Sequence, residues 1–241
     1  MPSSGFRGSR EIRVPYHIMP KTNTSILFLG KADDPDCARA LAFCQEHFTN
    51  VTYCLGVWGD PLPEAARNWQ GDYVISYLSR WVVPEFLLER ARKASFNFHP
   101  ASPDYPGIGC NNFALYEDAK EYGVTCHHMA SKVDTGAIIA VKRFPVYPED
   151  GVAELLERTY VHQIALFFEI VGLLAEGKEL PVSNETWTRP PFTRVQFNEL
   201  FIIRPGMSKD EIARRIRAIS FKHWQPYVEI EGYRFEYKPE K

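Results

Sequence analysis

The chain has 241 residues, of which 45% are hydrophobic and 24% charged, the balance of an ordinary globular protein. This length suits one large domain with a modest extension, and the composition excludes a collagen, a coiled coil and a wholly disordered chain. With 28 basic and 30 acidic residues, the net charge is −2, so no overall field attracts nucleic acid. No apolar run approaches the roughly 20 residues of a membrane helix, and no secretory signal is visible, which predicts a soluble, cytoplasmic protein.

The first half of the chain alternates predicted strands and helices. After a flexible tail over residues 1–22, the apolar run Ser25–Gly30 predicts a buried parallel strand. Asp34 followed by Pro35 signals a helix that we expect to end near Asn50. Further strands are predicted at 51–57, 73–77, 95–98, 124–129 and 138–146, and helices at 84–93 and 111–122. This alternation predicts an α/β fold with a mostly parallel sheet and helices on both faces.

The five cysteines predict neither a disulfide framework nor a structural zinc site, because they are odd in number and contain no C-x-x-C pair. Cys37 and Cys44 fall on one face of the first predicted helix, together with Leu41 and Phe48. We therefore expect buried, reduced thiols.

The second half begins with a long helix that opens at Asp150 and is closed by Gly177. It completes a core that we place at residues 23–178, with an extension at 179–241. The extension has three predicted parts: a proline-rich connector at 180–192, a helix introduced by a capping box at Ser208–Glu211, and a terminal β-hairpin with Glu231–Gly232 at its turn.

The most unusual polar residues follow the strand at 95–98. Asn97 and His99 are two positions apart, so on a strand they face the same side. They lie at the carboxyl end of that strand, where open α/β sheets bind ligands, and a loop stiffened by prolines and glycines follows. A carboxamide beside an imidazole can bind a developing oxyanion and move a proton. The alternative is that both side chains only cap the strand.

A second polar signal is the turn Val133–Gly136, immediately before the strand at 138–146. Its Asp134 either caps the turn locally or orients a histidine from a neighbouring strand. His127 and His128 are adjacent, so they face opposite ways on a strand and cannot chelate one metal; one of them lines the pocket or packs. Because no G-x-G-x-x-G follows the first strand, a dinucleotide cofactor is disfavoured.

The motif N-x-H-P at residues 97–100, with V-D-x-G-x-I-I at 133–139, resembles the folate-dependent formyltransferases. The likeness covers about Ser25–Val146. The family formylates methionyl-tRNA, glycinamide ribonucleotide or amino sugars. The resemblance implies a Rossmann-like formyltransferase core, N10-formyltetrahydrofolate as formyl donor, an amine as acceptor and no metal.

The resemblance also implies roles for single residues. Asn97 would bond the formyl oxygen, His99 would match the family's histidine, and Asp134 would hold that histidine and a nearby water. The pteridine would lie against two segments, formed by Ser79, Arg80, Trp81 and Val82 and by Ala130, Ser131, Lys132 and Val133. Core packing of Trp81 and Val82, and a solvated or folate-tail-binding Arg80, remain the alternatives.

The departures from the family pattern bear on the acceptor. The loop Ala101–Gly107 lacks the serine and two leucines found there in many members. From Pro181 onward, 11 basic residues stand against 8 acidic ones, a weak excess that disfavours tRNA. With the connector and the hairpin, the chain most resembles the sugar N-formyltransferases, which act on nucleotide-linked amino-deoxysugars (dTDP-sugars among them) for lipopolysaccharide and O-antigen. Another amine acceptor, hydrolysis of formyltetrahydrofolate, and a silent binding protein remain as alternatives.

A nucleotide-linked sugar needs a cationic clamp for its diphosphate and an aromatic surface. We expect these from Tyr105, Trp187, Arg189, Phe192 and Arg194. The helix residues Arg214, Arg215 and Arg217 form either an alternative clamp or a solvated face. The apolar residues of the terminal hairpin suggest edge-to-edge pairing with a second copy, hence a homodimer.

Overall fold

A computed structural model describes residues 21–238 of the chain. Residues 1–20, the greater part of the predicted tail, lie outside the described residues. Thr22, which we had assigned to that tail, already begins the first strand.

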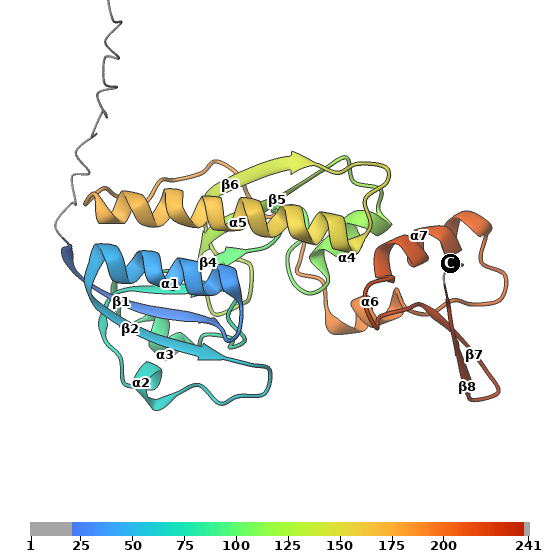
Figure 1. Ribbon diagram of the computed structural model, residues 1–241, viewed down its shortest axis with the longest axis horizontal. Coiled ribbons are helices and arrows are strands. Elements are labelled where there is room, and N and C mark those ends of the chain that lie inside the picture. The colour runs from blue at the N-terminus through green and yellow to red at the C-terminus, as the bar shows by residue number, and fades with distance from the viewer. Residues whose placement is uncertain (1–20, 239–241) are drawn as a thin grey trace, which may run out of the picture.

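One six-stranded sheet organises the core (Figure 1). Its strands are β1 (Thr22–Lys31), β2 (Phe48–Gly56), β3 (Gly71–Tyr77), β4 (Ala91–His99), β5 (Glu121–His128) and β6 (Ile138–Pro145). They lie in the order β2-β1-β3-β4-β5-β6. β1 to β4 pair in parallel, whereas β5 and β6 pair antiparallel. The predicted mostly parallel α/β sheet is thus confirmed.

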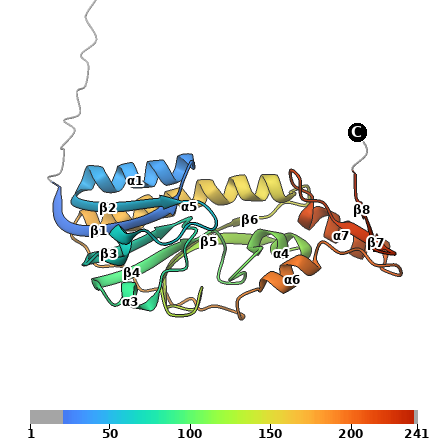
Figure 2. The same cartoon turned by 90° about the horizontal axis from the view of Figure 1, so that it is seen from below.

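Helices cover both faces of this sheet, as predicted. They are α1 (Pro35–His47), α2 (Glu64–Arg67), α3 (Glu85–Leu88), α4 (Cys110–Tyr116) and α5 (Val152–Ala175). α1 and α5 pack on one face, and α3 lies on the other (Figure 2). Ala66 of α2 and Leu87 of α3 share one core cluster on that second face. Along β1, Ile26 and Phe28 therefore join the core under α1 and α5, while Leu27 and Leu29 join the smaller core under the short helices.

Two predicted helices were too long. The helix expected at 84–93 is the single turn α3, because β4 begins at Ala91 and uses the rest of that segment as a strand. The helix expected at 111–122 ends at Tyr116, because Glu121 opens β5. In both places the pairing of a sheet strand overrides local helical propensity.

The extension contains one helix that we did not predict. α6 (Arg194–Glu199) follows Thr193, whose hydroxyl accepts from the backbone of Gln196 while the Gln196 side chain accepts from the backbone of Thr193. α7 (Lys209–Ile219) and the hairpin of β7 (Tyr227–Ile230) and β8 (Tyr233–Glu236) were predicted.

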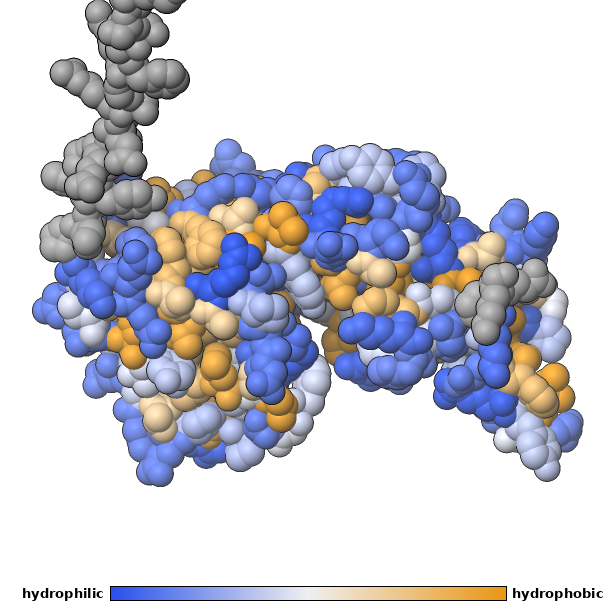
Figure 3. All heavy atoms as spheres, in the orientation of Figure 1, coloured by the Kyte–Doolittle hydropathy of each residue, from blue (hydrophilic) through white to orange (hydrophobic). Residues whose placement is uncertain are grey.

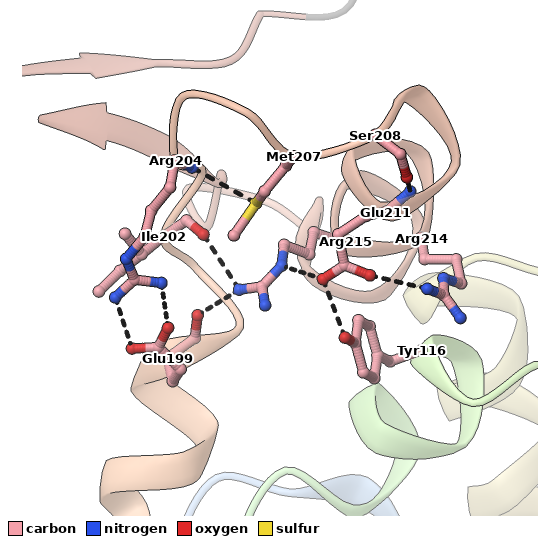
Figure 4. A network of polar contacts seen from close by, with 9 residues as sticks. All are labelled: Tyr116, Glu199, Ile202, Arg204, Met207, Ser208, Glu211, Arg214 and Arg215. Atoms are coloured by element: carbon pink, nitrogen blue, oxygen red, sulfur yellow. Dashed lines mark hydrogen bonds and ion pairs between the residues drawn. The ribbon is translucent and has the colours of Figure 1, made fainter.

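Polar contacts hold α7 both within the extension and against the core, and Figure 4 shows those around Arg215. The guanidinium of Arg215 donates to Glu211 and to the carbonyl oxygens of Glu199 and Ile202. Glu211 also accepts from the hydroxyl of Tyr116 on α4, so its carboxylate is not available to complete the predicted capping box.

All three arginines of α7 bond to other groups of the protein. The alternative prediction that they form a clamp for a diphosphate was therefore wrong. Arg215 is buried, and Arg214 pairs with Glu211. Arg217 donates to Asp118 and to the carbonyl oxygens of Tyr147 and Asp150. None of the three lines the cavity that opens beside Asn97 and His99 at the carboxyl end of β4.

All five cysteines are free, and the thiols of the first helix are buried as predicted. Burial raises the pKa of Cys37 to about 11 and that of Cys44 to about 12. Phe48, expected on the same helical face, is buried as the first residue of β2. Among residues 21–238, no helix combines the length and the apolar character needed to cross a membrane.

Candidate active site

The polar residues singled out in the sequence come together at the carboxyl end of β4. Asn97 and His99 lie on β4, and the antiparallel register sets Asn97 opposite His127 of β5. Asp134 enters from the loop between β5 and β6 with φ of 49°, a left-handed conformation that Asp tolerates better than most residues. Two strand ends and one loop therefore build a single cluster.

Asp134 is the centre of the cluster. Its Oδ2 lies 3.4 Å from Nδ1 of His99, and its Oδ1 lies 3.4 Å from Nε2 of His127. The backbone N–H of Gly107 donates to Oδ2 at 2.8 Å. Asp134, His99 and His127 are each exposed by 5% or less.

The surroundings of Asp134 fix its charge. Burial alone would raise the pKa of this carboxyl, but the charge of His99, the contact with His127 and the Gly107 N–H together lower the pKa to about 2. Asp134 is therefore ionised at neutral pH and holds both histidines.

His99 faces hydrogen-bond acceptors with both ring nitrogens. Its Nε2 lies 3.1 Å from the backbone oxygen of Tyr105, and its Nδ1 faces Asp134. Only the protonated ring can donate to both. In that form the ring can stabilise negative charge and deliver a proton.

His127 is the functional residue that the sequence left unresolved. Its Nε2 lies 3.2 Å from Nδ2 of Asn97, and its Nδ1 lies 2.8 Å from the backbone oxygen of His128. The alternation along β5 shows that only one of the adjacent histidines can face Asn97, but it does not show which.

The loop after β4 runs beside the connector. Phe192 donates its N–H to the oxygen of Pro106 and accepts from the N–H of Ile108. Gly107 has φ of 90°, and a Cβ there would collide with the backbone of Phe192. Only glycine allows this approach while its N–H reaches Asp134.

Trp187 of the connector packs against both histidines. Its ring lies edge-on to His127, with centroids 5.1 Å apart, and to His99, at 5.8 Å. Its Nε1–H donates to the oxygen of Gly136. Trp187 does not line the cavity, so it supports the site from behind.

Arg143 of β6 ties the active-site loop to the connector. It pairs with Asp104 of that loop at 2.9 Å and with Glu185 of the connector at 2.5 Å. Asp104 in turn accepts from the hydroxyl of Ser102. Sequence reasoning missed this residue, because its partners lie far apart along the chain.

A cavity of about 530 Å³ opens in front of the cluster. Asn97, His99, His127 and Asp134 line it. It is also lined by seven of the eight residues predicted to hold the pteridine, namely Ser79, Arg80, Trp81, Val82, Ala130, Lys132 and Val133. Ser131 does not line it. Leu78, with φ of 53°, turns the chain after β3 so that residues 79–82 reach this cavity.

Only two of the five residues predicted to bind a nucleotide sugar line the cavity. Phe192 and Arg194 line the cavity. Tyr105, expected as an exposed aromatic, is only 6% exposed and packs on Tyr122, so the premise of exposure was wrong. Arg189 lies outside the cavity lining and pairs with Glu117.

Within the described part of the chain, no group of three or more His, Cys, Asp and Glu residues is arranged to hold a metal ion.

Comparison of sequences finds one family whose model matches part of the chain. Residues 61–171 match the formyl transferase family. GDP-perosamine N-formyltransferase of Brucella melitensis is 29% identical over 175 residues, which are 70% of this chain and 65% of that protein. The matched part thus spans just under two thirds of that relative.

Solved structures share the fold. A 4-N formyltransferase from Francisella tularensis has a TM-score of 0.74 at 15% identity, covering 91% of this chain and 98% of the other. An N-formyltransferase from Helicobacter canadensis, in complex with folinic acid and dTDP-3-aminofucose, has a TM-score of 0.66 at 20% identity, covering 87% and 85%. At such identities the likeness shows the fold alone. Residues 61–171 therefore match the formyl transferase family, and the chain shares the fold of the solved formyltransferases.

Proposed function

We propose that this protein transfers the formyl group of N10-formyltetrahydrofolate to the amino group of a nucleotide-linked amino-deoxysugar. One observation carries the chemistry: Asn97, His99 and the ionised Asp134 meet at one wall of a cavity large enough for a ligand. The similarity to GDP-perosamine N-formyltransferase and to the N-formyltransferase solved with dTDP-3-aminofucose supports the choice of acceptor.

The residues suit formyl transfer to an amine. As the amine attacks the formyl carbon, negative charge develops on the formyl oxygen, and the Asn97 amide N–H binds it. His99, oriented by Asp134 and the Tyr105 carbonyl, in its protonated form stabilises the same charge and delivers a proton to the departing folate nitrogen. The proton lost by the amine returns the histidine to its charged form.

The cavity suits a flat pteridine. Its rim carries apolar side chains open to solvent, with Val82 72% and Val133 51% exposed, and Trp81 stands between β2 and the cavity. Contact with a planar ring would remove the apolar surface of these side chains from water, which favours binding. The two segments 79–82 and 130–133 would then bind the donor, as the sequence predicts.

We place the diphosphate of the acceptor near Arg194 and Phe192. A helix N-terminus is the usual phosphate site, but that of α1 is taken by the side chain of Asp34, which accepts from the N–H of Cys37. Asp34 also pairs with Lys31, the cation of the cavity wall nearest that helix. Arg80, Lys132 and Arg194 are the cavity cations without an acidic partner among the ion pairs of residues 21–238. Arg80 and Lys132 belong to the two segments assigned to the pteridine, which leaves Arg194 for the diphosphate.

A mass-spectrometric turnover assay tests the proposal. Protein and N10-formyltetrahydrofolate are mixed with dTDP-, UDP- and GDP-linked amino sugars, with an amine-free sample beside them. Gain of one formyl group on one sugar is the expected result. His99→Ala should lose about 10²- to 10⁴-fold in rate, whereas His223→Ala, at an exposed position of the extension, should retain it. Formate release without amine would instead identify a hydrolase, and an absence of turnover with all sugars would overturn the acceptor.

We also propose that the terminal hairpin pairs with a second copy. It projects from the body of the molecule (Figure 1), and hydrophobic side chains gather on it (Figure 3). Ile230, Tyr233 and Phe235 are between 53% and 72% exposed. A two-stranded sheet is marginal in water on its own, and a partner would cover these side chains. Light scattering should give the mass of a dimer, and Phe235→Glu should give a monomer; a monomeric wild type would refute this.

A further inference from the structure

Ser76 of β3 is a nearly buried serine that lines the cavity. It is only 5% exposed, yet its hydroxyl makes no hydrogen bond among residues 21–238. Polar atoms of Tyr77 and Gln163 also lack a partner there, but the protein encloses them, and neither residue lines the cavity. A desolvated hydroxyl without a hydrogen bond is unfavourable, so its place in the cavity wall points to a ligand as the partner.

The alternation along β3 shows which part of Ser76 reaches the cavity. Ile75 and Tyr77 belong to the core under α1 and α5, so Ser76 between them points to the other face of the sheet. Its backbone lies inside the sheet, in register with Leu29 of β1 and Asn97 of β4. The side chain is therefore the part of Ser76 that lines the cavity.

Ser76 belongs to a row of three polar side chains that crosses neighbouring strands. Its register partner on β4 is Asn97, whose partner on β5 is His127, and all three line the cavity. Asn97 and His127 contact each other at 3.2 Å, whereas Ser76 has no such contact. On the other side of Ser76, Leu29 of β1 is apolar and fully buried. A partner for the hydroxyl can therefore come only from the cavity.

The spacing of the strands allows Ser76 and Asn97 to bind the same ligand atom. Neighbouring strands lie about 4.8 Å apart, so an atom bonded to the Asn97 side chain can also lie about 3 Å from the Ser76 hydroxyl. A hydroxyl rotates about its C–O bond and can turn its hydrogen to an acceptor. The formyl oxygen is such an acceptor, and a second donor would stabilise the negative charge that develops on it.

We propose that Ser76 is a further binding residue for the formyl group, whose O–H donates to the formyl oxygen beside Asn97. The inference rests on the proposed function. It accounts for a serine at a position where the protein itself offers the hydroxyl no partner. Leu29 and Val74, which lie on the same face, belong to an apolar cluster, so an alanine would pack there equally well.

The contact can be measured by binding alone, without an acceptor. Calorimetry gives the Kd of the full-length wild type and of Ser76→Ala for N10-formyltetrahydrofolate and for tetrahydrofolate, which lacks the formyl group. Ser76→Ala should weaken binding of the formylated ligand about 2- to 10-fold and leave the Kd of tetrahydrofolate unchanged. An equal loss for both ligands, or no loss for either, would overturn the proposal. A wild type that binds neither folate would refute the proposed function on which it rests.

Ser95→Ala is the matched control for turnover and stability. Ser95 is 8% exposed and shares a face of β4 with Asn97, but its hydroxyl donates to the oxygen of Leu88, and it does not line the cavity. Ser76→Ala should lower kcat about 10- to 10²-fold, because Asn97 remains, with an unchanged melting temperature. Ser95→Ala should keep kcat and lower the melting temperature. A Ser76→Ala protein with a lower melting temperature and an unchanged kcat would show a structural serine and overturn the proposal.

Discussion

Replacement of Asp134 by Asn should change how stability depends on pH. Asparagine tolerates the left-handed backbone at this position, so the substitution removes the charge without adding backbone strain. The pKa of Asp134 falls from 3.8 to about 2 on folding. A depressed pKa contributes stability that is fully present above the unfolded value and is lost as pH falls through the folded one.

The magnitude follows from these two values. The ionised carboxylate stabilises the folded state by about 2 kcal/mol at pH 5 and above, by about 1 kcal/mol at pH 3, and by a few tenths at pH 2. The difference in unfolding free energy between wild type and Asp134→Asn should therefore shrink by about 1 kcal/mol from pH 5 to pH 3 and by about 2 kcal/mol by pH 2.

Urea unfolding of both proteins at intervals between pH 5 and pH 2 measures that difference. Glu149→Gln is the control, because its exposed side chain makes no hydrogen bond or ion pair among residues 21–238. The other carboxylates cancel in the comparison with wild type. A difference that stays constant over this range would refute the conclusion that Asp134 is ionised and paired in the folded protein.

Three further substitutions, one of them with a matched control, test the site. Asn97→Ala should lower kcat about 10²- to 10³-fold in the turnover assay without lowering the melting temperature, and a wild-type rate would contradict its role. Gly136→Ala should cost about 1–3 kcal/mol in urea unfolding, because the new methyl group would collide with the backbone oxygen of His128. Gly172→Ala, where a Cβ meets nothing within 4 Å, should be neutral or stabilising; equal effects of the two would refute the argument. Arg143→Met should raise KM for the acceptor and increase protease cleavage in the loop and connector that it joins, and unchanged values of both would show that the loop is held without it.

The sheet could be predicted from the sequence, because its strands are short apolar runs bounded by turn-forming residues. Asp34 and Pro35 start α1 in the predicted manner, with the Asp34 side chain accepting from Cys37. The hairpin forms at Glu231–Gly232, where both residues have positive φ, as an E-G turn suggests. These features depend on neighbours in the chain, so local patterns suffice.

The errors occur where distant partners decide. The segment at 84–93 has helical character, but its last three residues, from Ala91 on, belong to β4 and pair with β3. The connector and the loop at 103–108 pair through backbone groups, which no side-chain pattern reveals. Burial of Tyr105 depends on Tyr122 of β5, and the choice between His127 and His128 depends on sheet register. The candidate site residues Asn97, His99 and Asp134 were found from a motif, whereas the residues that support them needed the three-dimensional structure.

The contacts of α7 bear on how this protein could be re-engineered or could diversify. Tyr116 and Asp118, next to the catalytic loop in the core, bond directly to Glu211 and Arg217 of the extension. A chimaera that exchanges residues 179–238 for those of a relative, in order to alter the acceptor, would leave both core groups without partners. Such an exchange should fold only when Tyr116 and Asp118 are transferred with the extension. An exchange of the extension would therefore change the contacts that hold the end of α4 as well.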